Sequence, residues 1–184
     1  MGLKELSESM NKKPELYRHP SSQWFHTKFP VIKEKVNGLD NDKLISLIRS
    51  QGDKQRRRTN VKANMTNWFM HREHETFMAV ARSALGIAKE NSPHVVQMNV
   101  PDCWGAIYKK GDWTKTHDHW PYIWSFTYYV QCKHGDAPLV FPDAELSIYP
   151  EAGDMIVFPS WVRHSVPEQT SDSERIVVAG NIKH

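Results

Sequence analysis

The feature that most constrains the fold is a succession of short, β-rich segments in the second half of the chain. Turn residues such as Gly111-Asp112, Gly135-Asp136 and Gly153-Asp154 separate them, and no helical pattern lies between them. Many short strands joined by tight turns indicate an antiparallel sandwich or barrel. The predicted strands span residues 95–100, 104–108, 123–131, 138–141, 146–149, 155–158 and 175–181.

The first half of the chain predicts mostly helices. Asp40 or Asn41 can cap a helix that ends near Gly52 and carries Leu44, Ile45 and Ile48 on one face. A second helix is expected from about Glu73 to Ala88, because its apolar side chains recur at helical spacing. These are Phe77, Val80, Ala81, Leu85 and Ala88. The stripe indicates core packing and not a cofactor site.

The remaining N-terminal residues carry weaker signals. Residues 1–21 are polar and predict irregular structure or one short helix, and Gln23 to Phe29 could form a strand. Neither a repeat nor a low-complexity linker divides the chain. We therefore expect residues 1–184 to form a single domain, in which a mostly helical region, 1–93, supports a β core over 94–184.

Composition excludes several functional classes. The formal net charge of +3 is mild, so no general affinity for nucleic acid follows from it. Arg56-Arg57-Arg58 forms a local basic patch, interpreted either as a solvated loop or as a contact for an anionic substrate or partner. No apolar run approaches the roughly 20 residues of a membrane span. Charged residues near the start interrupt any signal peptide, so a cytoplasmic protein is expected, monomeric or homodimeric. Cys103 and Cys132 match neither a metal pair nor a disulfide framework.

Three histidines have a spacing that suits one metal ion. His117 and His119 lie two apart, and residues two apart in a strand project from the same face. His164, from a strand across a barrel, would complete one face of an octahedron. Such a site leaves positions open for substrate, cosubstrate or oxygen, as a non-haem iron catalyst requires. Asp118 could replace His119 as a ligand only if a bulge rotated the strand.

Arg175 opens the last predicted strand, and Val177, Ala179 and Asn181 share its face. An arginine in an otherwise apolar barrel needs an anionic partner, because burying an unpaired guanidinium is costly. Its planar fork suits a carboxylate held by two hydrogen bonds. A metal with open positions beside such an arginine is the physical requirement for 2-oxoglutarate as cosubstrate.

On these residues the chain resembles the Fe(II)/2-oxoglutarate-dependent oxygenases, and most closely the small bacterial and phage members of the prolyl-hydroxylase-like branch. Residues 108–119, Tyr-x-x-Gly-x5-His-x-His, resemble the first metal motif, and residues 127–130 resemble the strand that follows it. Residues 150–164, from Pro-x-x-Gly to Phe-Pro-Ser-Trp-x-x-His, resemble the second motif. Residues 175–181 are similar to the closing strand, and residues 60–68 to the N-terminal portion.

The resemblance implies a double-stranded β-helix, the jelly roll of cupins, buttressed by α-helices. It implies that His117, His119 and His164 hold Fe(II), with no catalytic side chain beyond these ligands. Arg175 would bind the distal carboxylate of 2-oxoglutarate, assisted by the hydroxyl of Tyr129 or Tyr108, and Asn181 would face cosubstrate or substrate. The implied reaction consumes O2, converts 2-oxoglutarate to succinate and carbon dioxide, and hydroxylates a small molecule or a peptide.

One position departs from the family pattern. Most of the superfamily has His-x-Asp or His-x-Glu, whereas His119 stands here at the acidic position. Three neutral imidazoles leave two positive charges on Fe(II) instead of one, which should weaken metal retention and alter oxygen reactivity. Two other interpretations stay open. One is a cupin-type three-histidine metalloenzyme without 2-oxoglutarate, and the other is a non-catalytic jelly-roll binding module.

Overall fold

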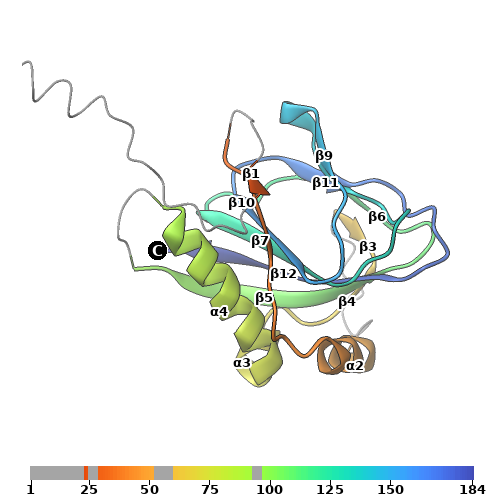
Figure 1. Cartoon of the computed structure of the whole chain (residues 1–184), viewed down its shortest axis with the longest axis horizontal. Helices are drawn as coiled ribbons and strands as arrows, with labels where there is room; N and C mark the ends of the chain where they lie inside the picture. The colour runs from red at the N-terminus through yellow and green to blue at the C-terminus, as the bar shows by residue number, and fades with distance from the viewer. Residues whose placement is uncertain (1–22, 25–28, 52–59, 93–96) are drawn as a thin grey trace, which may run out of the picture.

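Two antiparallel β-sheets and three described helices make up the protein (Figure 1). The computed structural model describes residues 23–24, 29–51, 60–92 and 97–184. The sequence predictions for residues 1–21 and for Arg56-Arg57-Arg58 lie outside these residues.

The larger sheet has the strand order β1-β2-β10-β7-β12-β5-β4. Its strands are β1 (Gln23–Trp24), β2 (Ile32–Lys35), β4 (Asn64–Met65), β5 (Asn99–Tyr108), β7 (Trp124–Gln131), β10 (Asp154–Pro159) and β12 (Arg175–Lys183). The smaller sheet has the order β3-β6-β11-β8-β9. Its strands are β3 (Val61–Lys62), β6 (Trp113–His117), β8 (Leu139–Phe141), β9 (Leu146–Ile148) and β11 (His164–Val166). A 3₁₀ turn, Pro142–Ala144, joins β8 to β9.

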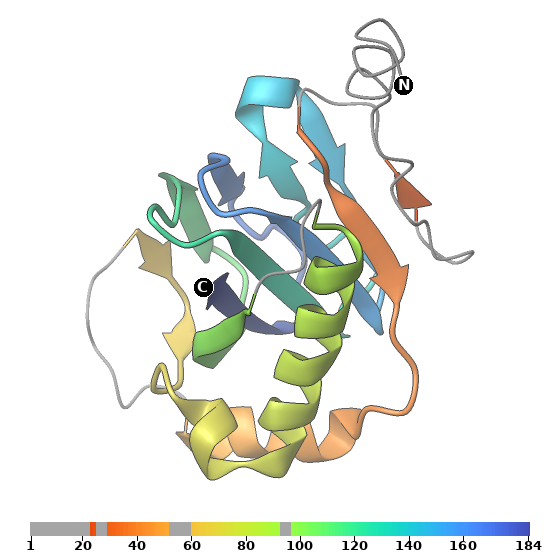
Figure 2. The ribbon, with the colours of Figure 1, turned by 90° about the vertical axis from the view of Figure 1, so that its left-hand side faces the viewer.

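Helices cover the outer face of the larger sheet. Helix α4 (Glu75–Glu90) lies across it, with α2 (Asn41–Gln51) and α3 (Met70–Glu73) at one end (Figure 2). The side chain of Asp40 accepts a hydrogen bond from the Lys43 backbone N–H at 3.0 Å, so the predicted cap of α2 is confirmed. The second predicted helix corresponds to α4, which begins at Glu75 because His74 has an extended backbone (φ −134°, ψ 121°) and separates α4 from α3.

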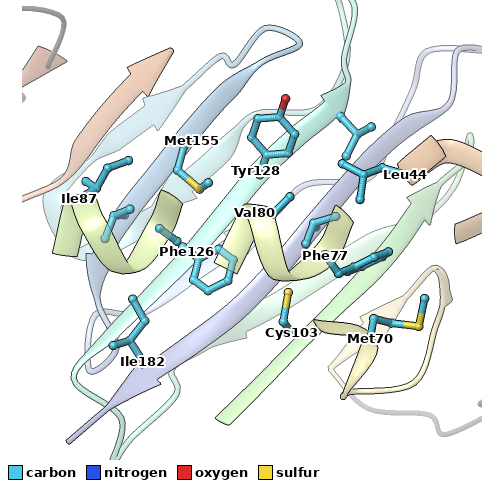
Figure 3. Packing of buried hydrophobic residues seen from close by; sticks show 14 of the residues in the cluster. Leu44, Met70, Phe77, Val80, Ile87, Cys103, Phe126, Tyr128, Met155 and Ile182 are labelled. Carbon is cyan, nitrogen blue, oxygen red and sulfur yellow. The ribbon is translucent and has the colours of Figure 1, made fainter. Parts of the chain in front are cut away.

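Strict alternation along the central strands creates two cores. On β12, Ile176, Val178 and Ile182 face the helices, whereas Arg175 and Val177 face the smaller sheet. The helix-side cluster contains Phe77 and Val80 of α4 packed on Phe126, Tyr128 and Met155 (Figure 3). The second cluster lies between the sheets and includes Trp104, Tyr129, Phe141, Phe158 and Val166. The expected jelly roll buttressed by helices is confirmed, and the space between its sheets can hold a site.

One expectation about the elements is wrong. The predicted strands 95–100 and 104–108 merge, over the described residues, into the single strand β5, and Pro101 lies within it. Proline is tolerated there because the β5–β12 register shifts beyond Asp102, so the missing N–H costs no regular ladder bond. The N-terminal region, predicted as a mostly helical support, also contributes strands to both sheets: β2 joins the larger sheet beside β10, and β3 joins the smaller one beside β6.

Cys103 and Cys132 are both free thiols. Within the described part of the chain, no helix combines the length and the apolar character that crossing a membrane requires.

Phe77 tests the helix-side core. Its side chain is completely buried under α4, so Phe77→Ala removes apolar contacts and leaves a cavity, and should lower the free energy of unfolding by about 3–5 kcal/mol. The matched control is Phe69→Ala, since Phe69 is 45% exposed and should cost about 1 kcal/mol or less. Urea denaturation measures both values, and equal losses would contradict the packing described.

Candidate metal centre

Neighbouring strands of the smaller sheet bring two histidines together. In the antiparallel pair β6–β11, His117 lies directly opposite His164, and their ring centroids are 4.4 Å apart. Facing residues in such a pair have their side chains on the same side of the sheet. The expectation that His164 approaches from across a barrel is therefore wrong: it comes from the adjacent strand.

His119 reaches the same point from a loop. Strand β6 ends at His117, so the two histidines do not share a strand face as predicted. The loop is fixed by its backbone, since the His119 N–H donates to the Ser160 carbonyl at 2.8 Å and the His119 carbonyl accepts from Tyr122 N at 3.0 Å. The His119 ring lies 4.8 Å from that of His117 and 5.1 Å from that of His164. One ligand atom from each of the three histidines lies within 4.8 Å of the others, as a shared metal ion requires.

Asp118 takes no part in this cluster. Its carboxylate accepts a hydrogen bond from the Trp120 backbone N–H at 3.0 Å and is exposed. The geometry therefore favours His119 over Asp118 as the third ligand.

Backbone carbonyls orient two of the rings. Nδ1 of His117 lies 2.8 Å from the Lys115 carbonyl oxygen, and Nδ1 of His164 lies 3.1 Å from that of Val162. Because a carbonyl only accepts, Nδ1 carries the proton in both rings and the lone pair of Nε2 is free for a metal. The His119 ring instead packs near Trp104, with centroids 6.3 Å apart.

All three imidazoles are neutral at pH 7. Burial lowers the pKa of His117, and burial with repulsion from His117 lowers the pKa of His119 to about 4. Burial, with repulsion from both neighbours, holds the pKa of His164 well below its usual value. Since a metal binds neutral imidazole, protons do not compete for these ligands near neutrality.

Arg175 projects from β12 of the larger sheet into the same cavity. It is 1% exposed, and its guanidinium lies 4.9 Å from the ring centroids of both Tyr108 and Tyr129. Nη2 donates to the Tyr129 hydroxyl at 3.2 Å. Among the residues that the structure describes, Nε and Nη1 have no hydrogen-bond partner. Buried N–H groups of a cation are rarely left unpaired, so the guanidinium fits an anionic ligand.

The two tyrosines differ in their hydrogen bonding. Tyr129 is fully buried, and burial raises its pKa to about 12, so it remains a neutral phenol whose proton is available to a ligand. The Tyr108 hydroxyl is hydrogen-bonded to the Thr114 hydroxyl at 2.8 Å. Of the two candidates, Tyr129 is the one that touches the guanidinium edge directly.

Asn181 lies behind the cavity wall, in a buried polar chain. Its Nδ2 donates to the Asp102 carboxylate, and its Oδ1 accepts from the Ser125 hydroxyl, both at 2.8 Å. The Ser125 hydroxyl is also 2.9 Å from that of Ser160, whose carbonyl holds His119. Asn181 is not among the described residues that line the cavity. A direct contact with cosubstrate would therefore require its amide to break these hydrogen bonds to Asp102 and Ser125.

The histidines and Arg175 open into one cavity of about 60 Å³. Apolar side chains such as Leu139, Phe158 and Val177 form most of its remaining wall. Sequence reasoning missed Ser125 and Thr127, which also line it. The signal was present, because both share a strand face with Tyr129 under period-two alternation.

The family comparison points to the same chemistry. A family model described as "Putative 2OG-Fe(II) oxygenase" matches residues 141–181, which include His164 and Arg175. No curated protein matches the chain in sequence. The match leaves His117 and His119 outside its range, so the geometry alone connects them to the matched segment.

Solved structures of 2-oxoglutarate (2OG) oxygenases share the fold. A viral collagen prolyl hydroxylase from Paramecium Bursaria Chlorella virus-1, in its 2OG complex, is 20% identical with a TM-score of 0.65, over 82% of this chain and 94% of that one. A Pseudomonas putida prolyl-4-hydroxylase is 18% identical with a TM-score of 0.63, over 85% and 94%. HygX from Streptomyces hygroscopicus, with nickel, 2OG and hygromycin B bound, is 10% identical with a TM-score of 0.65, over 85% and 83%. The resemblance predicted from the sequence is thus confirmed, and at these identities the likeness establishes the fold.

Removing one ring tests the metal centre. His164→Ala should weaken Ni(II) or Fe(II) binding by more than the roughly 10–100-fold typical of losing a group that only orients a ligand, because it deletes a ligand itself. Metal titration of the purified protein measures this, with His134→Ala, an exposed histidine, as the control that keeps wild-type affinity. Stoichiometric iron retained in His164→Ala would contradict the triad.

The lowered histidine pKa values also predict a pH effect on the metal-free protein. Below about pH 6.5 the histidines of the unfolded chain bind protons, whereas the buried imidazoles of the folded protein stay neutral. For His119 this difference persists down to about pH 4. Stability is therefore fully present above pH 6.5 and is lost as the pH falls through this window. His119→Gln should flatten the dependence and His134→Gln should not, as measured by urea denaturation at a series of pH values. Identical slopes in wild type and His119→Gln would argue against a buried neutral ring.

Proposed function

We propose that the protein is an Fe(II)- and 2OG-dependent oxygenase. The observation that carries the proposal is one cavity in which three imidazoles converge within 4.8 Å and a buried arginine presents two unpaired N–H groups. Neither half of this arrangement is needed for packing alone. The partial family match and the shared fold of 2OG-binding enzymes support the same conclusion.

The residues fit both an iron ion and 2OG. His117, His119 and His164 would hold iron on one side and leave its other positions open. The guanidinium of Arg175, whose Nε and Nη1 are unpaired, would take a carboxylate of 2OG, with the Tyr129 hydroxyl beside it. When bound, iron and 2OG supply the oxidising chemistry, in which O2 is consumed and 2OG becomes succinate and carbon dioxide.

The protein's own contribution is binding, orientation and exclusion of water. Apolar walls from both sheets surround the histidines and Arg175, so electrostatic contacts inside are stronger than in bulk water. Carbonyls fix the rings of His117 and His164 in the tautomer that binds metal. We assign hydroxylation of a small molecule or a peptide as the outcome, and the cytoplasm as the place of action.

A second candidate is a three-histidine metalloenzyme that does not use 2OG. His119 in place of a carboxylate favours it, whereas the unpaired buried edge of Arg175 argues for a carboxylate ligand. The two are separated by assay: iron-dependent formation of succinate from 2OG supports the oxygenase. Metal-dependent oxygen uptake without 2OG supports the alternative. If neither activity is detected, the interpretation as a non-catalytic binding module is favoured.

Arg175 provides the residue-level test. Arg175→Ala should raise the dissociation constant of 2OG for the Ni(II)-loaded protein at least tenfold, which corresponds to about 1.4 kcal/mol of lost binding. Calorimetry measures this dissociation constant. Arg175→Lys keeps the positive charge but loses the planar guanidinium, so its dissociation constant for 2OG should lie between those of the wild type and Arg175→Ala. The control is Arg82→Ala, an exposed arginine paired with Glu75 on α4. Unchanged 2OG affinity in a folded, metal-binding Arg175→Ala protein would sink the assignment.

A further inference from the structure

The cavity has no negative charge of its own. Among the described residues that line it, the ionisable side chains are the three histidines, Tyr108 and Arg175, and none is an aspartate or a glutamate. The imidazoles are neutral as ligands, and Tyr129, which contacts the guanidinium from the adjacent wall, is a neutral phenol. Arg175 is therefore the one fixed charge of this lining, and it is positive.

The nearest carboxylates are engaged elsewhere. Asp118 is exposed and accepts from the Trp120 backbone. Asp102 accepts from both the backbone N–H and Nδ2 of Asn181, at 3.1 and 2.8 Å, and the Asn181 and Ser125 side chains separate it from the cavity. Asp143 pairs with Arg163, whose Nε lies 2.9 Å from it. Asp118 attracts the charged forms of His117 and His119 from the exposed side, but none of these three carboxylates lines the cavity that the triad and Arg175 share.

The charge of the loaded site follows from these residues. A divalent metal and Arg175 together bring three positive charges, whereas 2OG brings two negative ones. One positive charge then remains in a water-poor cavity, where an uncompensated charge is costly. An acidic residue at position 119 would cancel it, but this chain has His119 there.

We infer that the missing negative charge is supplied by the substrate, so that the protein acts on a molecule whose carboxylate binds beside the metal. The inference rests on the proposed function and names the substrate class for the same site. Attraction between a carboxylate and the surplus charge is stronger there than in bulk water because most of the cavity lining is apolar. The same charge disfavours cationic substrates.

Acetate is the probe, because it is a bare carboxylate, and acetamide is its neutral counterpart of the same shape. Wild-type protein loaded with Co(II) and saturated with 2OG should bind acetate at millimolar concentration and acetamide at least tenfold more weakly. The Co(II) visible spectrum and calorimetry both report this binding without catalysis. His119→Asp introduces a negative charge at the metal site and should weaken acetate binding at least tenfold when the protein is likewise saturated with 2OG. His134→Asp makes the same change at an exposed site and should leave acetate affinity unchanged.

Each outcome decides the inference. Equal acetate affinity in wild type and His119→Asp means an adventitious ion only and overturns it, as does failure of wild-type protein to bind acetate. If His119→Asp does not bind Co(II), His119→Glu is used in its place. If neither variant binds Co(II), the comparison of acetate and acetamide affinities in the wild-type protein decides. Failure of 2OG itself to bind the Co(II)-loaded protein would instead overturn the proposed function. In a screen by succinate release, stimulating compounds should be carboxylates, and their primary amides should be inactive.

Discussion

The pairing of His117 with His164 across β6 and β11 is the constraint on which the site depends. Two antiparallel strands place these rings 4.4 Å apart without help from any loop, and carbonyls two residues earlier in the chain fix both tautomers. The third ring needs only a short loop tied back to Ser160. The positions of two of the three histidines thus depend on the register of one strand pair. A slip of one residue in that register would turn one of these rings to the opposite face of the sheet.

The facing sheet contributes the other half. Its strand β12 inserts Arg175 between two tyrosine rings and sends Val178 and Ile182 outward under the helices. The helices therefore serve the site indirectly, because they cover the outer face of the sheet whose inner face carries the guanidinium. A buried cation with an unpaired edge is unfavourable for the folded state, and such local cost is expected where a ligand is meant to bind.

Much of this could be predicted from the sequence because long strands alternate and long helices repeat. The period-two pattern placed β7, β10 and β12, and with them Tyr129 and Arg175. Two-residue strands such as β3 and β4 carry no period, and their pairing with β6 and β5 depends on contacts far along the chain. The predicted separation of residues 95–100 from residues 104–108 failed because a register shift lets β5 continue through Pro101. The loop position of His119, and the Asn181–Ser125–Ser160 chain, follow from tertiary packing that local spacing does not contain.

The most direct test is a crystal structure of the protein with Ni(II) and 2OG bound, from crystals grown under anaerobic conditions. The account predicts one metal ion bound by His117, His119 and His164, and a carboxylate of 2OG on the guanidinium of Arg175. A metal bound by other residues, or 2OG located away from Arg175, would contradict it.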